Sequence, residues 1–184
     1  MYWCKLKVTP AIFVALGLLC LAACKPDVKQ TGAALTFFDI QGYFQKDTSV
    51  LQKKKPPVLK TVTHNGQTQS KTVHIADWGK ELNLFFAADI NRPAWKDSYT
   101  VVDNSDFLIY KAKDPELQTR QVIIKKGKDK TNVAWLLIYT RTKNFLYQTT
   151  AKLTYYPDSL YIIEQQQHVR LMGNNTYMIK GVLR

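Results

Sequence analysis

Four side chains that could bind a polar ligand lie close together near the middle of the sequence. Asp89 and Asn91 supply a carboxylate and an amide, and Arg92 and Trp95 add a guanidinium and an indole. Groups of this kind hold ligands through charge, hydrogen bonds and ring stacking. The same residues could instead be structural: Asp89 and Asn91 would close a helix end and its turn, with Arg92 paired to Asp89. Trp95 would then fill the edge of the core. We expect either a contact for a ligand or partner, or a structural corner.

The thiol of Cys24 is the second candidate for chemistry. Lys5 and Lys7 precede an uncharged apolar run over residues 11–23, which ends in Leu21-Ala22-Ala23 directly before the cysteine. The run is shorter than the roughly 20 apolar residues that cross a bilayer, and it is typical of an export signal. Small side chains let the backbone lie extended in a peptidase cleft, and a thiol is the nucleophile that accepts diacylglycerol. The segment resembles the lipobox of bacterial lipoproteins.

This resemblance implies a signal peptide over residues 1–23, a lipidated tether over residues 24–32 and a single domain over residues 33–184. Cys24 would become the new N-terminus, and its acyl chains would anchor the protein to the outer membrane of the cell envelope. A plain N-terminal membrane helix and a secretory signal with a chance cysteine are the alternatives. The residues after Cys24 lack the paired acidic signal of surface-exported lipoproteins, so we expect the periplasmic face.

The other cysteines and the histidines do not indicate a metal or redox site. Cys4 and Cys20 lie within the predicted signal peptide, so acylation of Cys24 would leave no thiol for a disulfide or for a thiolate metal site. None of the three histidines has the spacing of a metal ligand. The sequence also lacks the motifs for nucleophilic catalysis, phosphate binding and dinucleotide binding. We therefore expect no metal, no cofactor and no enzymatic activity.

The net charge of the chain is strongly positive. It is +12 for the whole sequence, and loss of Lys5 and Lys7 with the signal peptide would lower it to +10. Such a charge would suggest nucleic acid as a partner in a cytosolic protein, but export makes nucleic acid unavailable. The available partners are an envelope protein, lipid or glycan. The main basic clusters, Lys53-Lys54-Lys55 and residues 125–128, fall where elements end, which is typical of solvated loop charge.

Two helices with a hairpin between them are predicted in the first half of the domain. Helical spacing of apolar residues from 33 to 53 predicts the first helix, and Pro56-Pro57 ends it. Asn65-Gly66 between β-prone runs predicts a tight hairpin over residues 58–73. A second helix is predicted to begin at Asp77 and to end at Asn91-Arg92-Pro93.

The second half of the domain reads as strands separated by turn residues. The predicted strands cover residues 99–102, 107–111, 121–126, 132–141, 144–156, 159–166 and 177–182. Short turns between them predict an antiparallel meander. Residues 133–139 are apolar on both faces, which predicts a strand at the middle of the sheet that is covered on both sides, or a strand at a closed part of the sheet. The fold class is therefore α+β, with both helices packed on a twisted antiparallel sheet.

The order of several short motifs carries a resemblance over nearly all of the predicted domain. These motifs are Phe38-Asp39-Ile40-Gln41-Gly42-Tyr43-Phe44, Lys60-Thr61-Val62, Asn65-Gly66, Asp77-Trp78, Lys80-Glu81-Leu82, Asp89-Ile90-Asn91 and Pro93-Ala94. Together they resemble a group of small Bacteroidetes lipoproteins with one α+β domain of unknown function. The resemblance implies the domain boundaries and the location, and it assigns no role to any residue other than the lipidated Cys24.

Two functional hypotheses follow from these observations. The first is a non-enzymatic envelope lipoprotein that acts as a binding or interaction module. The alternative is a receptor or carrier for a lipid or another hydrophobic ligand, held between sheet and helices in a cavity lined by aromatic side chains. Those side chains would be Phe37, Phe44, Trp78, Phe85 and Trp135. An empty cavity would favour the carrier, and a filled core with an exposed aromatic patch would favour the interaction module.

Overall fold

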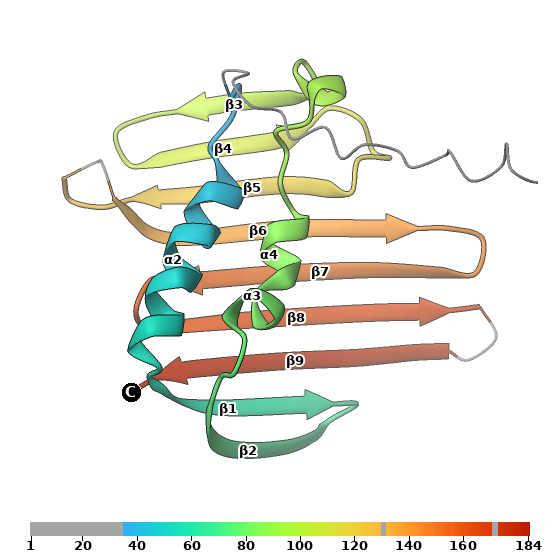
Figure 1. The fold of residues 1–184 in the computed structure, drawn as a ribbon. Helices are drawn as coiled ribbons and strands as arrows, with labels where there is room; N and C mark the ends of the chain where they lie inside the picture. The colour runs from blue at the N-terminus through green and yellow to red at the C-terminus, as the bar shows by residue number, and fades with distance from the viewer. Residues whose placement is uncertain (1–34, 130–131, 171–172) are drawn as a thin grey trace, which may run out of the picture. The chain divides into compact units, whose positions relative to one another are not determined.

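Nine antiparallel strands form one sheet in the order β2-β1-β9-β8-β7-β6-β5-β4-β3 (Figure 1). The computed structural model describes residues 35–129, 132–170 and 173–184, so the predicted signal peptide and tether, with Cys24, lie outside the described residues. The strands are β1 (Pro57–His64), β2 (Gln67–His74), β3 (Tyr99–Asp103), β4 (Phe107–Ala112), β5 (Thr119–Lys126), β6 (Val133–Lys143), β7 (Tyr147–Tyr156), β8 (Leu160–Val169) and β9 (Gly173–Leu183). The predicted mixed α+β fold, dominated by an antiparallel sheet, is confirmed.

The helical segments all cross one face of this sheet (Figure 1). They are α2 (Ile40–Lys54), α3 (Trp78–Glu81), α4 (Asn83–Ala87) and the 3-10 helix η2 (Pro93–Trp95). Helix α2 begins later than its apolar spacing suggests because Asp39 caps it, accepting a hydrogen bond from the Gly42 amide at 2.8 Å. It ends at Lys54. The next residue, Lys55, has a left-handed backbone, and Pro56 and Pro57 follow it. The second predicted helix is divided at Leu82 into the short α3 and α4.

The hairpin between β1 and β2 follows from its two turn residues. Asn65 and Gly66 both have positive φ angles, 47° and 85°, as a two-residue type I′ turn requires. His64 therefore pairs with Gln67, and the register continues to Pro57 opposite His74. On its other side β1 pairs with β9, with Val58 opposite Leu183. The hairpin is thereby joined to the far end of the meander that runs from β3 to β9.

A single core lies between the helices and the sheet. Phe44 of α2 is at its centre, with its ring centroid 4.9 Å from that of Phe85 and 5.0 Å from that of Tyr155. Burial of aromatic side chains dominates the stability of such a core, because each removes a large apolar area from water. The core comprises Phe37, Ile40, Phe44, Leu51, Val58, Trp78, Leu82, Phe85, Ala88, Ile90, Tyr99, Tyr110, Ala112, Val122, Ile124, Leu136, Ile138, Ala151, Leu153, Tyr155, Tyr161 and Ile163.

The expectation for residues 133–139 is corrected by the position of β6. Its even-numbered residues Leu136 and Ile138 are buried beneath the helices, as expected. Its odd-numbered residues point to the opposite face, and Tyr139 there is exposed. None of the elements in the described part of the chain covers this second face (Figure 1). The prediction that this strand lies in the middle of the sheet is confirmed, because β6 lies between β5 and β7. The prediction that it is covered on both sides or lies at a closed part of the sheet is wrong, because the helices cover only one of its two apolar faces.

A close contact at Gly181 fixes the helices on the sheet. A side chain at Gly181 would place its Cβ 2.2 Å from Cε1 of Tyr161, so the tyrosine ring occupies the space that the glycine leaves. The Tyr161 hydroxyl donates to Oε1 of Glu81 at 2.5 Å, and Nζ of Lys60 lies 2.7 Å from the same oxygen. Burial and the Glu81 carboxylate raise the pKa of Tyr161. One contact thus joins α3 to β1, β8 and β9.

Among the residues that the structure describes, no helix is both long enough and apolar enough to cross a membrane.

Candidate functional site

Asn91, one of the four predicted contact residues, is tied to the backbone before α2. Its Oδ1 accepts from the Phe37 amide at 2.9 Å, and its Nδ2 donates to the carbonyls of Phe37 at 3.3 Å and Phe38 at 2.9 Å. These bonds use both hydrogens of the side-chain amide, which has two donor hydrogens in all. Little of the Asn91 amide remains for a ligand.

The other three predicted contact residues lie around the same corner. The Asp89 carboxylate accepts a hydrogen bond from the backbone N–H of Asn91 at 3.4 Å. Burial raises the pKa of Asp89 above its ordinary value. In the described chain Arg92 stacks on Trp95, with its guanidinium carbon 4.4 Å from the ring centroid, and makes no ion pair with Asp89. The Trp95 ring is half-buried against the core. The four residues are thus brought together, and the exposed guanidinium of Arg92 is the group most available to a partner.

The aromatic residues expected to line a cavity do not surround one space. Phe37, Phe44, Trp78 and Phe85 are all buried in the core, where rings contact rings. Phe37 packs edge-on against Tyr99 and Tyr110 at centroid distances of 5.5 and 5.4 Å, and Phe44 contacts Phe85 and Tyr155. Trp135 lies on the opposite face of the sheet, against Phe107 and Tyr156. Side chains therefore fill the layer where a carrier would hold its ligand.

The face of the sheet opposite the helices, called the open face here, carries an apolar band. In one row across the strands, Ile109 pairs with Ile123 and Ile123 pairs with Leu137. Aromatic rings form the next row, with centroids 6.0 Å apart for Phe107 and Trp135 and 6.5 Å apart for Trp135 and Tyr156. The open-face band consists of Phe107, Ile109, Ile123, Trp135, Leu137, Tyr156, Leu160 and Ile162. Thr154 lies between Leu137 and Ile162, and Lys125 lies between Phe107 and Trp135. An apolar band of this extent, interrupted by a few polar side chains, is typical of an interaction site.

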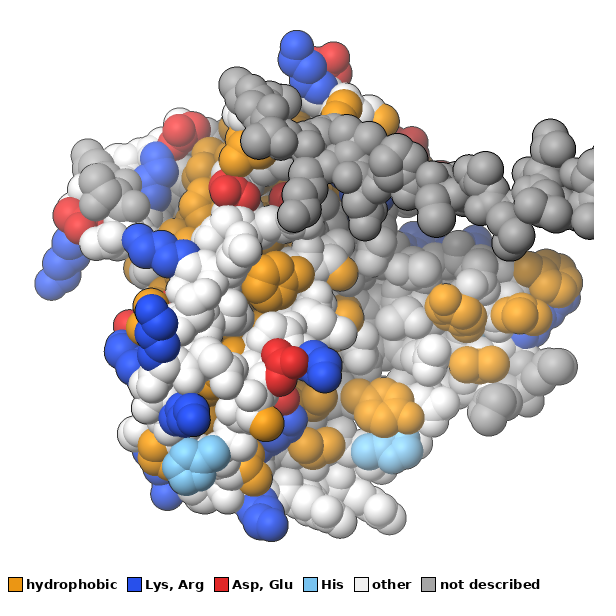
Figure 2. Space-filling model, viewed as in Figure 1, with side chains coloured by type: hydrophobic (Ala, Val, Ile, Leu, Met, Phe, Trp, Pro, Cys, Tyr) orange, Lys and Arg blue, Asp and Glu red, His pale blue; other side chains and the backbone are white. Residues whose placement is uncertain are grey.

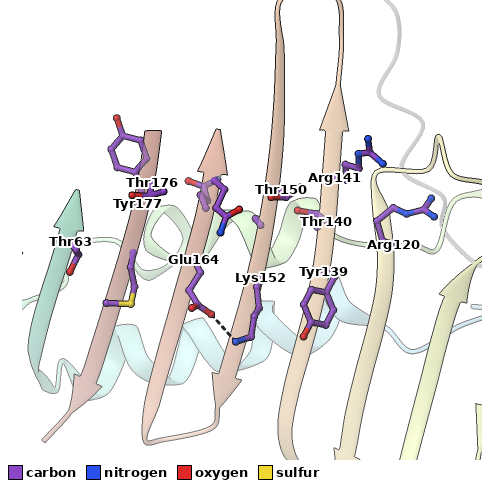
Figure 3. Close-up of a pocket in the computed structure, with 14 residues that line it drawn as sticks. Thr63, Arg120, Tyr139, Thr140, Arg141, Thr150, Lys152, Glu164, Thr176 and Tyr177 are labelled. Carbon is purple, nitrogen blue, oxygen red and sulfur yellow. Dashed lines mark ion pairs between the residues drawn. The ribbon is translucent and has the colours of Figure 1, made fainter. Parts of the chain in front are cut away.

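A hollow lies beside the open-face band, farther along the strands (Figure 3). Its volume is about 490 Å³. Lys152 and Glu164 point toward each other across β7 and β8, with Nζ 2.9 Å from Oε2. Tyr139 lies on the neighbouring strand β6, and Met178 pairs with Glu164 from β9. The hydrogen bond that Lys152 donates to Glu164 raises the pKa of Lys152, which keeps the ammonium charged. The hollow thus offers the Tyr139 ring, the Met178 thioether and the ion pair of Lys152 with Glu164.

The charges around the hollow are mostly positive. Arg120 and Arg141 line it with Lys152, whereas Glu164 is the only acidic residue among its described lining residues. Arg141 donates to Oε1 of Gln148 at 3.1 Å. On the helix-bearing side, lysine and arginine side chains gather mainly over α2 and the nearby strand ends (Figure 2). The cations near the hollow are therefore separate from those over α2. Their positive charge favours an acidic partner.

The titratable groups with raised pKa values lie apart from the open-face hollow. No group of three or more His, Cys, Asp or Glu side chains within the described ranges could hold a metal ion. The half-buried carboxyl groups whose pKa values are raised are Asp47 and Asp89. Asp47 accepts a hydrogen bond from Tyr155 beneath α2, and neither carboxylate lines the hollow. A surface of rings and aliphatic chains with fixed ion pairs is suited to holding a partner.

The open-face residues were not predicted as a site because they are far apart in the sequence. Tyr139, Lys152, Glu164 and Met178 come from four strands, and only the strand register brings them into one row. One signal was present: residues 133–139 are apolar on both faces, while the predicted helices could cover only one face of a sheet. Comparison of the chain with family models, with curated proteins and with solved structures found no match.

Proposed function

We propose that this protein is a non-enzymatic binding module of the bacterial cell envelope that docks another envelope protein on its open face. Acylated Cys24 anchors it to the outer membrane, facing the periplasm, as the resemblance of residues 1–24 to a lipoprotein signal suggests. The observation that carries the proposal is the apolar band that no described element covers. The filled layer between helices and sheet favours this interaction module over a carrier.

The composition of the open face matches the centre of a protein interface. Aromatic residues are enriched at such centres, and rings that sit beside a pocket often carry most of the binding energy. Trp135 and Tyr156 supply such rings. The hollow lies farther along the same strands, beyond the row of Leu137, and can accept a protruding side chain of the partner. Lys125 lies over the Phe107 ring at 4.4 Å and adds positive charge at the edge of the band. The partner should therefore present an apolar surface with an acidic rim.

A photo-crosslinking amino acid at Tyr156 tests the docking surface in the full-length, membrane-bound protein. We expect adducts with one envelope protein, and we expect Tyr156→Glu in the unlabelled protein to abolish its capture. Val50→Glu is the matched control, because Val50 and Tyr156 are each 38% exposed and Val50 lies on α2. Adducts with phospholipid alone, or equal capture by both variants, would refute docking through the open face.

The anchor is tested separately. We expect Cys24→Ala to release the protein from the membrane fraction or to leave it unprocessed, because an alanine has no thiol to accept the diacylglycerol group. Mass spectrometry of the wild-type N-terminus should show an acylated Cys24. An unmodified cysteine, or a mature chain that begins at another residue, would contradict the proposed lipidation and location.

A further inference from the structure

A groove lies on the helix-bearing face where β6, β7, β8 and β9 extend beyond α4 (Figure 1). The volume of this groove, called the distal groove here, is about 290 Å³. Its lining residues are Thr142, Tyr147, Thr149, Gln165, Gln167 and Tyr177. Their side chains alternate along the strands with those of the open face, so the distal groove lies mainly on the opposite side of the sheet from the open-face hollow. Gln165 and Tyr177 border both.

The strand register places the polar groups of the groove in rows. Thr142 pairs with Thr149, and Thr149 pairs with Gln167, which gives one row across β6, β7 and β8. Gln165 pairs with Tyr177 in the next row, across β8 and β9. Neighbouring strands lie about 4.8 Å apart, so a ligand lying across all four strands would span roughly 14 Å. This length suits an extended chain of small polar units.

The polar side chains of the groove are unused within the described structure. The amides of Gln165 and Gln167 and the hydroxyls of Thr142 and Thr149 make no hydrogen bond to another described residue. Amides and hydroxyls can both donate and accept. None of the six lining residues carries a charge. The groove therefore offers matched donors and acceptors to an uncharged polar ligand, and it offers no counter-charge to an ionic one.

Two tyrosine rings border this polar floor. Tyr147 is 37% exposed and Tyr177 is 38% exposed. The Tyr177 ring stacks on the imidazole of His64, with centroids 4.3 Å apart and the planes 9° from parallel. The stack holds the ring in place before any ligand binds, which lowers the entropy lost on binding. The groove therefore combines a preformed aromatic ring with amides that are free within the described residues.

We propose that the distal groove binds a neutral saccharide. A sugar ring has a face of C–H groups that stacks on an aromatic ring, and its edge carries hydroxyls that donate and accept. Tyr147 and Tyr177 supply the rings, while Gln165 and Gln167 supply the partners for the hydroxyls. An apolar ligand would bury these amides without hydrogen-bond partners, which is unfavourable. A charged ligand would find no opposite charge among the lining residues.

This proposal goes beyond the proposed function and does not depend on it. The distal groove faces the helix side of the sheet, whereas protein docking uses the open face. Loss of a protein partner in Tyr156→Glu with saccharide binding intact would separate the two, as would the reverse result in a groove variant.

Calorimetry and affinity electrophoresis with the full-length protein test the proposal, in a detergent that has no sugar headgroup. The neutral probes are maltohexaose, cellohexaose, mannohexaose and xylohexaose, and hexagalacturonate is the charged probe. A second arm uses vesicles with and without purified lipopolysaccharide, because the same sugar chemistry can come from a free oligosaccharide or from a membrane glycan. Binding to a soluble probe indicates the first source, and binding to lipopolysaccharide vesicles alone indicates the second.

The variants Gln167→Ala and Tyr177→Ala should each weaken saccharide binding at least tenfold. Gln166→Ala is the matched control, because Gln166 lies between two groove residues in sequence and points to the open face. It should bind like the wild type. Circular dichroism should show that all three variants are folded. No binding in either arm at millimolar concentration, binding of hexagalacturonate alone, or equal binding by Gln167→Ala and Gln166→Ala would overturn the proposal.

Discussion

The two halves of strands β7 and β8 have different environments although one ladder of hydrogen bonds runs through both. Under the helices, Leu153, Tyr155, Tyr161 and Ile163 are buried. Beyond the helices, the same face presents tyrosine, threonine and glutamine. The two strands stay paired along their whole length, from Tyr156 opposite Leu160 to Tyr147 opposite Val169. The comparison shows that apolar side chains determine where the helices pack on the sheet. Backbone hydrogen bonds between the strands can extend the sheet well past this core.

This division separates stability from binding. The covered half holds the rings and aliphatic chains whose burial stabilises the fold. The extended half holds side chains that contribute little to the core and are free to meet a ligand. Substitutions should therefore have large effects on stability in one half and on binding in the other.

The largest expected effect comes from the centre of the covered half. Phe44→Ala removes a fully buried ring that contacts Phe85 and Tyr155, so it should lower the free energy of unfolding by about 3–5 kcal/mol. Chemical denaturation measures this change. The control is Phe145→Ala in the turn between β6 and β7, where the residue is 80% exposed and the expected loss is under about 0.5 kcal/mol. Equal losses would remove the distinction between the halves.

The next effect concerns the contact of Gly181 with Tyr161. Gly181→Ala should destabilise the protein by about 2–3 kcal/mol, because the new Cβ would lie 2.2 Å from the tyrosine ring. The double variant Gly181→Ala/Tyr161→Ala removes that overlap. The two substitutions should therefore be non-additive in a double-mutant cycle, with the alanine at 181 costing little once the ring is gone. Additive effects would show that the contact is not what limits position 181.

A smaller effect compares two side-chain amides. Asn91 makes three hydrogen bonds with the backbone before α2, whereas Gln167 makes none within the described residues. Asn91→Ala should lower the free energy of unfolding by about 1–2 kcal/mol, and Gln167→Ala should change it by less than about 0.5 kcal/mol. Thermal unfolding of both variants measures the difference. A result in the opposite order would make Gln167 structural and Asn91 a candidate for ligand contact.

The smallest effect is a pH dependence confined to the covered half. Burial raises the pKa of Asp47, so the folded protein takes up this proton more readily than the unfolded chain. The resulting stability is fully present below the unfolded pKa and is lost as pH rises through the folded pKa. The Tm of the wild type relative to Asp47→Asn should therefore increase as the pH falls from neutral.

Asp77 provides the control of opposite sign. A hydrogen bond from the Lys80 amide lowers its pKa, so its contribution to stability is present above the unfolded pKa and is lost on acidification. The Tm of the wild type relative to Asp77→Asn should decrease as the pH falls. Gln165→Ala, which removes no titrating group, should leave the pH profile of Tm unchanged. Parallel profiles for Asp47→Asn and Asp77→Asn would contradict the assigned pKa shifts.

The strands under the helices, the β1–β2 hairpin and the whole of β7 could be predicted from the sequence, and the polar ends of β8 and β9 could not. Alternation of apolar and polar residues marked the strands, and Asn65-Gly66 marked the hairpin, because core burial and turn geometry both constrain residue type. The predicted strands 159–166 and 177–182 stopped short of the observed β8 and β9. The missing residues, 167–169 and 173–176, are mostly polar, so no apolar periodicity reveals a strand that is wet on both faces.

The site depended on register, which the sequence did not supply. Asp89 and Asn91 were predicted as contact residues because they are polar and close together in the sequence. In the structure Asn91 holds the backbone before α2. The residues of the open-face hollow and the distal groove are single positions on separate strands. They become neighbours only through pairing over long sequence separations. That pairing depends on the whole sheet, so local patterns cannot indicate it.

The pairing of β1 with β9 sets an order of events for the folding chain. Lys60 of β1 lies opposite Gly181 of β9, so the first hairpin of the sheet can dock only after the final strand of the meander has been made. Contacts between segments so distant in sequence also form slowly. Deleting β9 should therefore leave β1 and β2 as an isolated two-stranded hairpin, which is marginally stable in water at best.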